Sequence, residues 1–352
     1  MKKMIDIGNQ IVGFTNLSPA SRKKKIDALN AYFLFLKNSD VLFRRSNFQS
    51  NAELFSKLKI DTDYIISKLY SIENHISLEN RKSARTLFRD YLGKYFFKSN
   101  ILRRFYEKPF GYAGDHIMFE LIYNNVPISK NFGLYFDKYI LNFPLIKSVV
   151  NRKNFMKILI DDFLIRYKRN NISVLNIGSG SCRESKEYFP TADFKSKRKK
   201  IHLTLLDQDK KSLDFSEKVL CEISNQIKIR TIQANVLSLL NFEKMNHVVE
   251  NKTFDFIYSM GLVDYFKDQT LLSFVKNINK FLKPGGEIVI AACSSNKIAA
   301  YCALRWFCEW NFNARNALHT LEMIKACLPD NVIKIHWEPN KQVFFVAIRK
   351  AE

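Results

Sequence analysis

The feature that most constrains this chain is a change of pattern near Ile172, after which short apolar runs alternate with helical stretches. Strands that alternate with helices pair in parallel through crossover connections. The last two apolar runs are separated only by residues 338–341, a gap that fits an antiparallel hairpin and not a crossover helix. The pattern therefore predicts an α/β fold with a Rossmann-like seven-stranded sheet that ends in an antiparallel hairpin. The expected strands are 173–177, 202–207, 228–233, 254–259, 287–292, 332–337 and 342–349.

The part of the chain before this sheet is expected to be helical. Apolar residues recur at three- and four-residue steps between residues 84 and 95, which indicates one face of a helix. A second helical region is interrupted at residues 108–115 (KPFGYAGD), where a proline and two glycines favour a shaped loop. We predict a helical N-terminal region over 1–100, a helical cap with this loop over 101–170, and the sheet domain over 171–352.

Composition excludes several protein classes. The hydrophobic fraction of 47% is that of a globular protein, and no apolar run approaches the roughly 20 residues that span a bilayer. The N-terminus has no long apolar stretch of the kind found in secretory signals, so a cytoplasmic location is expected. The six cysteines form neither a C-x-x-C pair nor a Cys/His cluster, so we predict no metal site and no disulfide framework.

The net charge of +22 raises the question of an anionic partner. Basic runs at 22–25 and 195–200 fit solvated loops or helix ends, which is the interpretation we favour. The alternative is a nucleic acid or an anionic membrane surface, toward which a basic protein is drawn electrostatically. The sequence does not separate these readings, and it does not indicate the oligomeric state.

A glycine turn follows the first expected strand. Gly178 and Gly180 permit positive φ and a close approach of the backbone to a ligand. The next strand ends in Asp207, whose carboxylate is placed to accept hydrogen bonds from both hydroxyls of a ribose. A dinucleotide site requires a third glycine, but Arg183 stands at that position. The order of strand, glycine turn, helix and acid therefore predicts a nucleoside-containing cofactor other than a dinucleotide.

These elements resemble the class I methyltransferases. The likeness extends to a polar and an apolar residue after the third strand, a fourth strand that ends at the switch point of the sheet, and the turn 282–287 (LKPGGE) before the fifth. The resemblance implies S-adenosylmethionine as cofactor. The residues expected to bind it are Gly178, Ser179, Gly180, Glu184, Asp207, Gln208, Asn235, Val236, Ser259 and Gly261.

A closer resemblance covers roughly residues 100–350. The segments 108–115, 258–265 (YSMGLVDY) and Glu309-Trp310 with Arg315 are similar to methyltransferases related to the synthesis of 3-hydroxy fatty acid methyl esters, which are quorum-sensing signals. An Asn-Arg pair at 151–152 and the run 207–209 (DQD) also match that family. The chain departs from the family at three positions, Asn176, Cys182 and Phe110.

This resemblance implies carboxyl O-methylation of a 3-hydroxy fatty acid or a similar acidic, lipid-like metabolite. A carboxylic acid with a pKa of about 4–5 is already a nucleophile at pH 7 and needs no general base. Arg152 and Arg315 are expected to hold the anionic group of the acceptor, because a guanidinium binds a carboxylate in a bidentate manner. Two structural alternatives stay open, a tight packed turn at 111–114 and a buried structural ion at Arg315. The residues expected to contact the reacting groups are Tyr112, Asp115, His116 and Tyr265.

Three alternative functions stay open. The positive charge suggests RNA or DNA methylation, but residues 259–262 (SMGL) stand where amino-methylating DNA enzymes carry an Asp/Asn-Pro-Pro-aromatic motif. A non-catalytic module that binds S-adenosylmethionine is the second alternative, although both glycines and Asp207 are retained. Transfer of the aminocarboxypropyl group of the same cofactor is the third.

Overall fold

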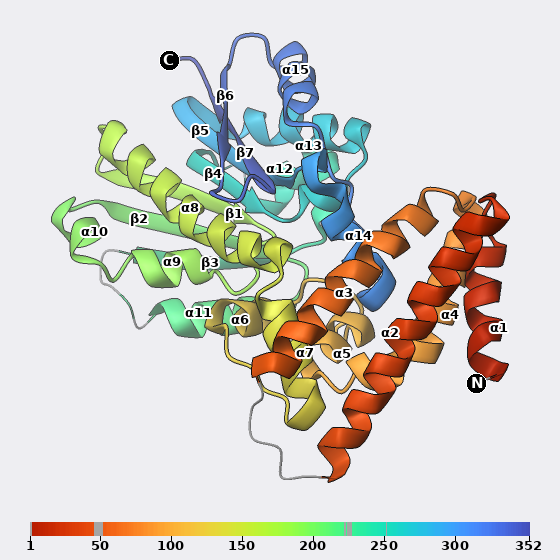
Figure 1. The fold of residues 1–352 in the computed structure, drawn as a ribbon. Coiled ribbons are helices and arrows are strands. Elements are labelled where there is room, and N and C mark those ends of the chain that lie inside the picture. The colour runs from red at the N-terminus through yellow and green to blue at the C-terminus, as the bar shows by residue number, and fades with distance from the viewer. Residues whose placement is uncertain (1, 46–51, 222, 224–226, 251) are drawn as a thin grey trace. The chain divides into compact units, whose positions relative to one another are not determined.

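The computed structural model describes residues 2–45, 52–221, 223, 227–250 and 252–352, which fold into two compact units. A helical unit consists of 1–114, 124–146 and 297–311, and a sheet unit consists of 115–123, 147–296 and 312–352 (Figure 1). These boundaries differ from those predicted at residues 100 and 170. Residues 115–123 and 147–170, predicted as parts of the cap, belong to the sheet unit. Residues 297–311, predicted as part of the sheet domain, belong to the helical unit. Each unit is described by itself.

The helical unit includes a helix from the C-terminal part of the sequence. Helix α14 contacts α3, α4 and α5, although it follows the fifth strand of the sheet in the chain. The helices of this unit are α1 (Lys2–Gly13), α2 (Pro19–Arg45), α3 (Ala52–Glu73), α4 (Leu78–Phe96), α5 (Asn100–Glu107), α7 (Asn131–Leu141) and α14 (Ile298–Cys308).

A buried carboxylate joins α14 to α3 and α4. Glu73 at the end of α3 forms ion pairs of 2.8 Å with both Arg85 and Arg305, and it accepts a hydrogen bond of 2.6 Å from the indole nitrogen of Trp306. Burial raises the pKa of Glu73, but the two guanidinium groups outweigh that effect and hold the pKa below its usual value. The charge is thus paired where it is buried, which explains why α14 folds with the helical unit.

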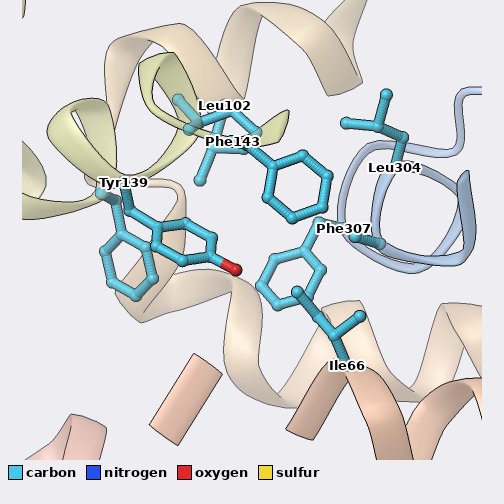
Figure 2. Close-up of a pocket in the computed structure, with 9 residues that line it drawn as sticks. Ile66, Leu102, Tyr139, Phe143, Leu304 and Phe307 are labelled. Atoms are coloured by element: carbon cyan, nitrogen blue, oxygen red, sulfur yellow. The ribbon is translucent and has the colours of Figure 1, made fainter. Parts of the chain in front are cut away.

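The core of the helical unit contains a small apolar cavity. Figure 2 shows Tyr139, Phe143 and Phe307 around it, together with aliphatic side chains such as Ile66 and Leu304. The Tyr139 hydroxyl donates a hydrogen bond of 2.7 Å to Asp63, so the polar atom of the Tyr139 side chain has a partner. The cavity therefore offers apolar contacts from α3, α5, α7 and α14.

The sheet unit is built on seven strands in the order β3-β2-β1-β4-β5-β7-β6. Strands β1 to β5 are parallel, whereas β7 runs antiparallel to both β5 and β6, which confirms the predicted terminal hairpin. The order reverses between β1 and β4, so this is the point where ligands bind open α/β sheets. The strands are β1 (Asn171–Ile177), β2 (Lys200–Asp207), β3 (Ile227–Gln233), β4 (Phe254–Met260), β5 (Leu282–Cys293), β6 (Val332–Trp337) and β7 (Val343–Arg349).

Helices cover both faces of the sheet (Figure 1). On one face Phe163 of α8 packs against Phe256 of β4, with ring centroids 4.8 Å apart. On the other face Phe274 and Ile324 join a buried cluster with strand residues such as Ile257. The remaining elements of this unit are α6 (His116–Asn124), α8 (Pro144–Arg166), α9 (Arg183–Tyr188), α10 (Ala192–Ser196), α11 (Lys210–Cys221), η1 (Val236–Leu240), α12 (Phe242–Val248), η2 (Val263–Tyr265), α13 (Asp268–Lys280), η3 (Ser295–Lys297) and α15 (Ala317–Cys327).

The fifth strand starts earlier than predicted. The segment 282–287 was expected as a turn, but β5 begins at Leu282, and its register with β4 shifts at Phe254 and Phe256. Gly286 permits this irregular pairing, because a Cβ there would lie 2.7 Å from the carbonyl oxygen of Asp255. A side chain would therefore separate the two strands.

The described residues contain neither a membrane-spanning helix nor a cluster of metal ligands. No helix within them combines the length and the apolar character needed to cross a membrane. No group of three or more His, Cys, Asp or Glu side chains among them is arranged to hold a metal ion.

Candidate functional site

The glycine turn after β1 is held in a fixed shape at the carboxyl edge of the sheet. Gly178 and Gly180 adopt φ of +67° and +54°, where only glycine is free of strain. The amide of Gly178 donates to the Leu206 carbonyl at 2.8 Å, which ties the turn to the end of β2. The hydroxyls of Ser212 and Ser216 on α11 each donate to the Gly180 carbonyl at 2.8 Å. The turn is thus preorganised by three hydrogen bonds.

Asp207 ends β2 with its carboxylate directed at the same turn. The carboxylate accepts hydrogen bonds from the Gly180 amide at 2.9 Å and from the Asp209 amide at 3.0 Å. Burial raises the pKa of Asp207, and these amides act in the opposite direction. The next residue, Gln208, is exposed, and its carbonyl accepts from the Gln233 side chain at 3.2 Å. Each carboxylate oxygen keeps acceptor capacity for a ligand hydroxyl, since a carboxylate has about four lone-pair positions.

The residues after β3 form a short helical turn. Asn235 caps η1, because its side-chain oxygen accepts a hydrogen bond of 2.9 Å from the Leu237 amide. Its side-chain amide nitrogen is left as a donor, and Val236 beside it is 7% exposed. The expected pair of a polar and an apolar residue therefore lies at the carboxyl end of β3, next to the end of β2.

The carboxyl end of β4 is joined to β1 and contacted by an arginine. The Ser259 hydroxyl donates to the Ile177 carbonyl at 2.7 Å, so it links the two strands. Gly261 follows with φ of +84°. A Cβ at Gly261 would lie 2.7 Å from a terminal nitrogen of Arg152, so the guanidinium occupies the space that this glycine leaves.

A buried polar network lies behind the turn. Glu184 on α9 accepts hydrogen bonds from the Tyr258 hydroxyl at 2.8 Å and from the Asn176 amide at 3.2 Å. The Cys182 thiol lies 3.4 Å from the same carboxylate oxygen. Burial raises the pKa of Glu184. Two departures from the family pattern, Asn176 and Cys182, thus contact one carboxylate.

Helix α6 is fastened to the sheet unit at three points. Near its start, the His116 imidazole lies 3.6 Å from the Asp209 carboxylate. In its middle, Glu120 forms an ion pair of 2.6 Å with Arg183 at the start of α9. Phe119 lies under the Arg152 guanidinium, 5.6 Å from ring centroid to guanidinium carbon. A segment predicted as part of the cap therefore belongs to the cofactor-binding unit.

Of the residues that were expected to contact the reacting groups, three belong to the sheet unit, namely Asp115, His116 and Tyr265. Asp115 is buried and caps α6 by accepting the Met118 amide at 3.0 Å. Tyr265 ends η2 and is 45% exposed, with its ring centroid 6.1 Å from that of Phe312. Tyr112 lies in the helical unit. The reactive roles of Tyr112, Asp115, His116 and Tyr265 stay predictions.

Arg315 is a buried structural ion. It pairs with Asp268 at the start of α13 and donates hydrogen bonds to the carbonyls of Val263 and Phe266. Its own amide donates to the Cys293 carbonyl at 2.8 Å. One terminal nitrogen pairs with α13 and the other bonds to carbonyls at η2, which favours the structural alternative over acceptor binding.

Among the buried polar atoms that have no hydrogen-bond partner in the described residues are the Ser179 hydroxyl in the glycine turn and the Nε of Arg152. Ser179 is 6% exposed and Arg152 is 5% exposed. Buried polar groups in native proteins are almost always hydrogen-bonded, so both atoms are available to a polar ligand.

Known proteins share parts of this sequence and of this fold. Residues 168–338 match the family model described as a methyltransferase domain, and no curated protein matches the sequence. A solved structure of a possible exported protein from Bordetella parapertussis is 13% identical, covers 96% of this chain and 100% of its own, and has a TM-score of 0.53. Magnesium protoporphyrin IX methyltransferase from Synechocystis is 9% identical over 76% of this chain and 99% of its own, with a TM-score of 0.44.

The donor set fits S-adenosylmethionine. The cofactor carries ribose hydroxyls for Asp207, an adenine ring for Asn235 and Val236, and a charged amino-acid end that needs polar partners such as the two unsatisfied atoms. The sequence did not single out Tyr123, Ser212 or Ser216, because no local motif marks them. Only the fold brings α6 and α11 to the turn.

Proposed function

We propose that this chain, whose residues 168–338 match a methyltransferase domain, is a class I S-adenosylmethionine-dependent methyltransferase that transfers a methyl group to a small acidic acceptor. The observation that carries the proposal is the Asp207 carboxylate, which is bonded to the Gly180 amide at the carboxyl edge of the sheet. A strand-end acid beside a glycine turn is suited to a nucleoside whose ribose carries two free hydroxyls.

Each part of the cofactor has a counterpart in the chain. Asp207 would accept the ribose hydroxyls, and the backbone from Gly178 to Gly180 would approach the sugar and the amino-acid end. Val236 would contact the adenine ring, and the Asn235 side-chain nitrogen would donate to it. When bound, S-adenosylmethionine supplies an electrophilic methyl group on a sulfonium sulfur.

The chain's own contribution to the reaction is alignment of the two reactants. The glycine turn is held by the two α11 serines and by the end of β2, so the cofactor site needs little reorganisation on binding. A carboxylate acceptor fits this chemistry, because it is deprotonated at neutral pH and needs no side chain to remove a proton.

For the acceptor we propose the carboxyl group of a 3-hydroxy fatty acid or a similar lipid-like acid. The support is the resemblance at 108–115, 258–265 and 309–315, together with the chemistry of a carboxylate. We further propose that Tyr112, Asp115, His116 and Tyr265 lie around the acceptor. We also propose that the chain binds an anionic membrane surface as a source of such an acid, since its net charge of +22 favours that contact.

The test is mass spectrometry after incubation with methyl-labelled S-adenosylmethionine. Cell extract, a panel of straight-chain and 3-hydroxy fatty acids, and RNA and DNA are each supplied to the wild-type protein and to the Asp207→Asn variant. We expect label in a methyl ester with the wild-type protein and a large loss with the variant. Label in nucleic acid instead would overturn the acceptor class. Absence of S-adenosylhomocysteine binding would overturn the enzyme proposal itself.

A further inference from the structure

We infer that Arg152 binds the carboxylate of the cofactor's amino-acid end, with Ser179 beside it and Tyr123 holding the guanidinium in place. The inference rests on the proposed function, since it assigns residues to one end of the proposed cofactor. It differs from the expectation that Arg152 grips the acceptor.

Arg152 is a buried cation with spare hydrogen-bonding capacity. It is 5% exposed, its Nε has no partner, and it forms no ion pair with any described carboxylate. Its guanidinium lies over the Phe119 ring and next to the Cα of Gly261. It also donates a hydrogen bond to the Tyr123 hydroxyl. The guanidinium is near enough to the buried Asp264 carboxylate to counteract the rise in the pKa of that acid, but no ion pair joins the two groups. A buried guanidinium is stabilised by a direct anionic partner, and a ligand carboxylate would supply one.

The strand order indicates that the carboxylate bound by Arg152 is that of the cofactor and not that of the acceptor. The adenine contacts lie at the end of β3 and the ribose acid lies at the end of β2, which pairs with both β3 and β1. Because the order is β3-β2-β1-β4, a cofactor laid from adenine to ribose continues over β1 toward β4. Its amino-acid end therefore arrives at the turn after β1 and at Gly261, where Arg152 lies.

The second unsatisfied atom lies on an adjacent loop. Ser179 is in the turn after β1, and a Cβ added to its neighbour Gly178 would lie 3.7 Å from Leu262, the residue after Gly261. The two loops are thus adjacent, and the Ser179 hydroxyl and the Arg152 Nε are both buried polar atoms without partners at this junction. One carboxylate with two oxygens can accept from both.

Tyr123 acts as a positioning residue. It lies on α6, and its hydroxyl accepts a hydrogen bond from Arg152. The Lys153 ammonium lies over its ring, with 5.4 Å between the nitrogen and the ring centroid. Burial raises the pKa of Tyr123 to about 12, so the hydroxyl stays protonated at neutral pH. Glu184 is close enough to raise the pKa of the same hydroxyl, so an acidic side chain also lies near Tyr123.

The experiment compares three ligands by calorimetry. S-adenosylhomocysteine has the whole amino-acid end. Decarboxylated S-adenosylmethionine lacks the carboxylate and carries the sulfonium methyl group, and 5′-methylthioadenosine lacks the whole amino-acid end, so each variant is compared with the wild type for the same ligand. We expect Arg152→Ala to weaken S-adenosylhomocysteine binding at least 30-fold while leaving 5′-methylthioadenosine and the decarboxylated cofactor within about 3-fold. Tyr123→Phe should produce the same selectivity with a smaller loss of about 3- to 10-fold.

Arg166→Ala is the matched control, since Arg166 lies on the same helix α8 and pairs with Glu287. Glu287 is the strand neighbour of Phe256 near the start of β4, at the opposite end of the strands from the proposed cofactor site. It should leave all three affinities unchanged. Gly261→Ala is an independent variant, because its Cβ would lie 2.7 Å from the guanidinium and displace it without removing the charge. It should show the same selective loss.

The inference is overturned if Arg152→Ala binds S-adenosylhomocysteine as tightly as the wild type, or if it loses all three ligands equally. A raised acceptor KM with unchanged S-adenosylhomocysteine affinity would assign Arg152 to the acceptor. Failure of the proposed function is a different result, in which the wild-type protein binds none of the three ligands.

Discussion

Replacing Asp207 with Asn is the sharpest test of the cofactor site. The Asp207 carboxylate accepts one backbone amide on each oxygen, from Gly180 and from Asp209. Asparagine has the same size but only one acceptor oxygen, so one amide loses its partner and one ribose hydroxyl loses its acceptor. A hydrogen bond to a charged group contributes about 1.5–3 kcal/mol. The dissociation constant for the cofactor should therefore rise by about 10- to 150-fold.

The assay is isothermal titration with S-adenosylhomocysteine, with far-UV circular dichroism to check that the variant is folded. Asp214→Asn is the control, because Asp214 is exposed on α11 and pairs only with Lys210 at 2.8 Å among its described ion-pair contacts. We expect wild-type affinity for the control. Wild-type affinity for Asp207→Asn would refute the assignment of the ribose site to the end of β2.

Three further predictions concern stability and reactivity. Gly133→Ala should lower the free energy of unfolding by at least about 2 kcal/mol in urea denaturation, because its Cβ would lie 2.1 Å from the Lys98 carbonyl oxygen, whereas Gly13→Ala, with nothing within 4 Å, should change it little. Three cationic side chains outweigh burial and lower the pKa of Glu187 from 4.5 to about 2, so its stabilisation is complete above pH 4.5 and is lost as the pH falls toward 2. Glu187→Gln should therefore destabilise the protein at pH 7 by at most about 3 kcal/mol, reduced by solvent screening, and by less at pH 3; an equal effect at both pH values would contradict this. Iodoacetamide followed by peptide mass mapping should label Cys221 first, because it is exposed, whereas burial raises the thiol pKa of Cys182, Cys302 and Cys308.

Much of the sheet could be predicted from local patterns. Strands that are buried on both faces appear as continuous apolar runs, and the four residues between the last two strands leave room only for a hairpin. The bounds of β6 agree with the prediction residue for residue. The bounds of β5 do not agree, because Leu282 already pairs with Phe254, before the register shift that precedes the pairing of Glu287 with Phe256. The Pro-Gly-Gly sequence lies within that shift and resembles a turn when only the sequence is considered.

The cofactor residues were predictable where they lie next to a strand end. Gly178, Gly180 and Asp207 are each marked by the end of an apolar run, and a parallel sheet brings such ends to one edge. Ser259 has the predicted position but a different partner, since its hydroxyl bonds the Ile177 carbonyl. The direction of a hydroxyl depends on the neighbouring strand, which a local motif does not contain.

The sequence by itself thus determined the strand pattern, the glycine turn and the acid at the end of β2, because those features depend on short-range periodicity and backbone freedom. Only the tertiary structure decided which distant residues complete the site. Arg152 reaches Gly261 across 109 positions of the chain, and α6 brings Tyr123 to the same guanidinium. It also decided that Arg315 is bonded within the fold and that α14 belongs to the helical unit, since the partners of a buried charge are set by packing.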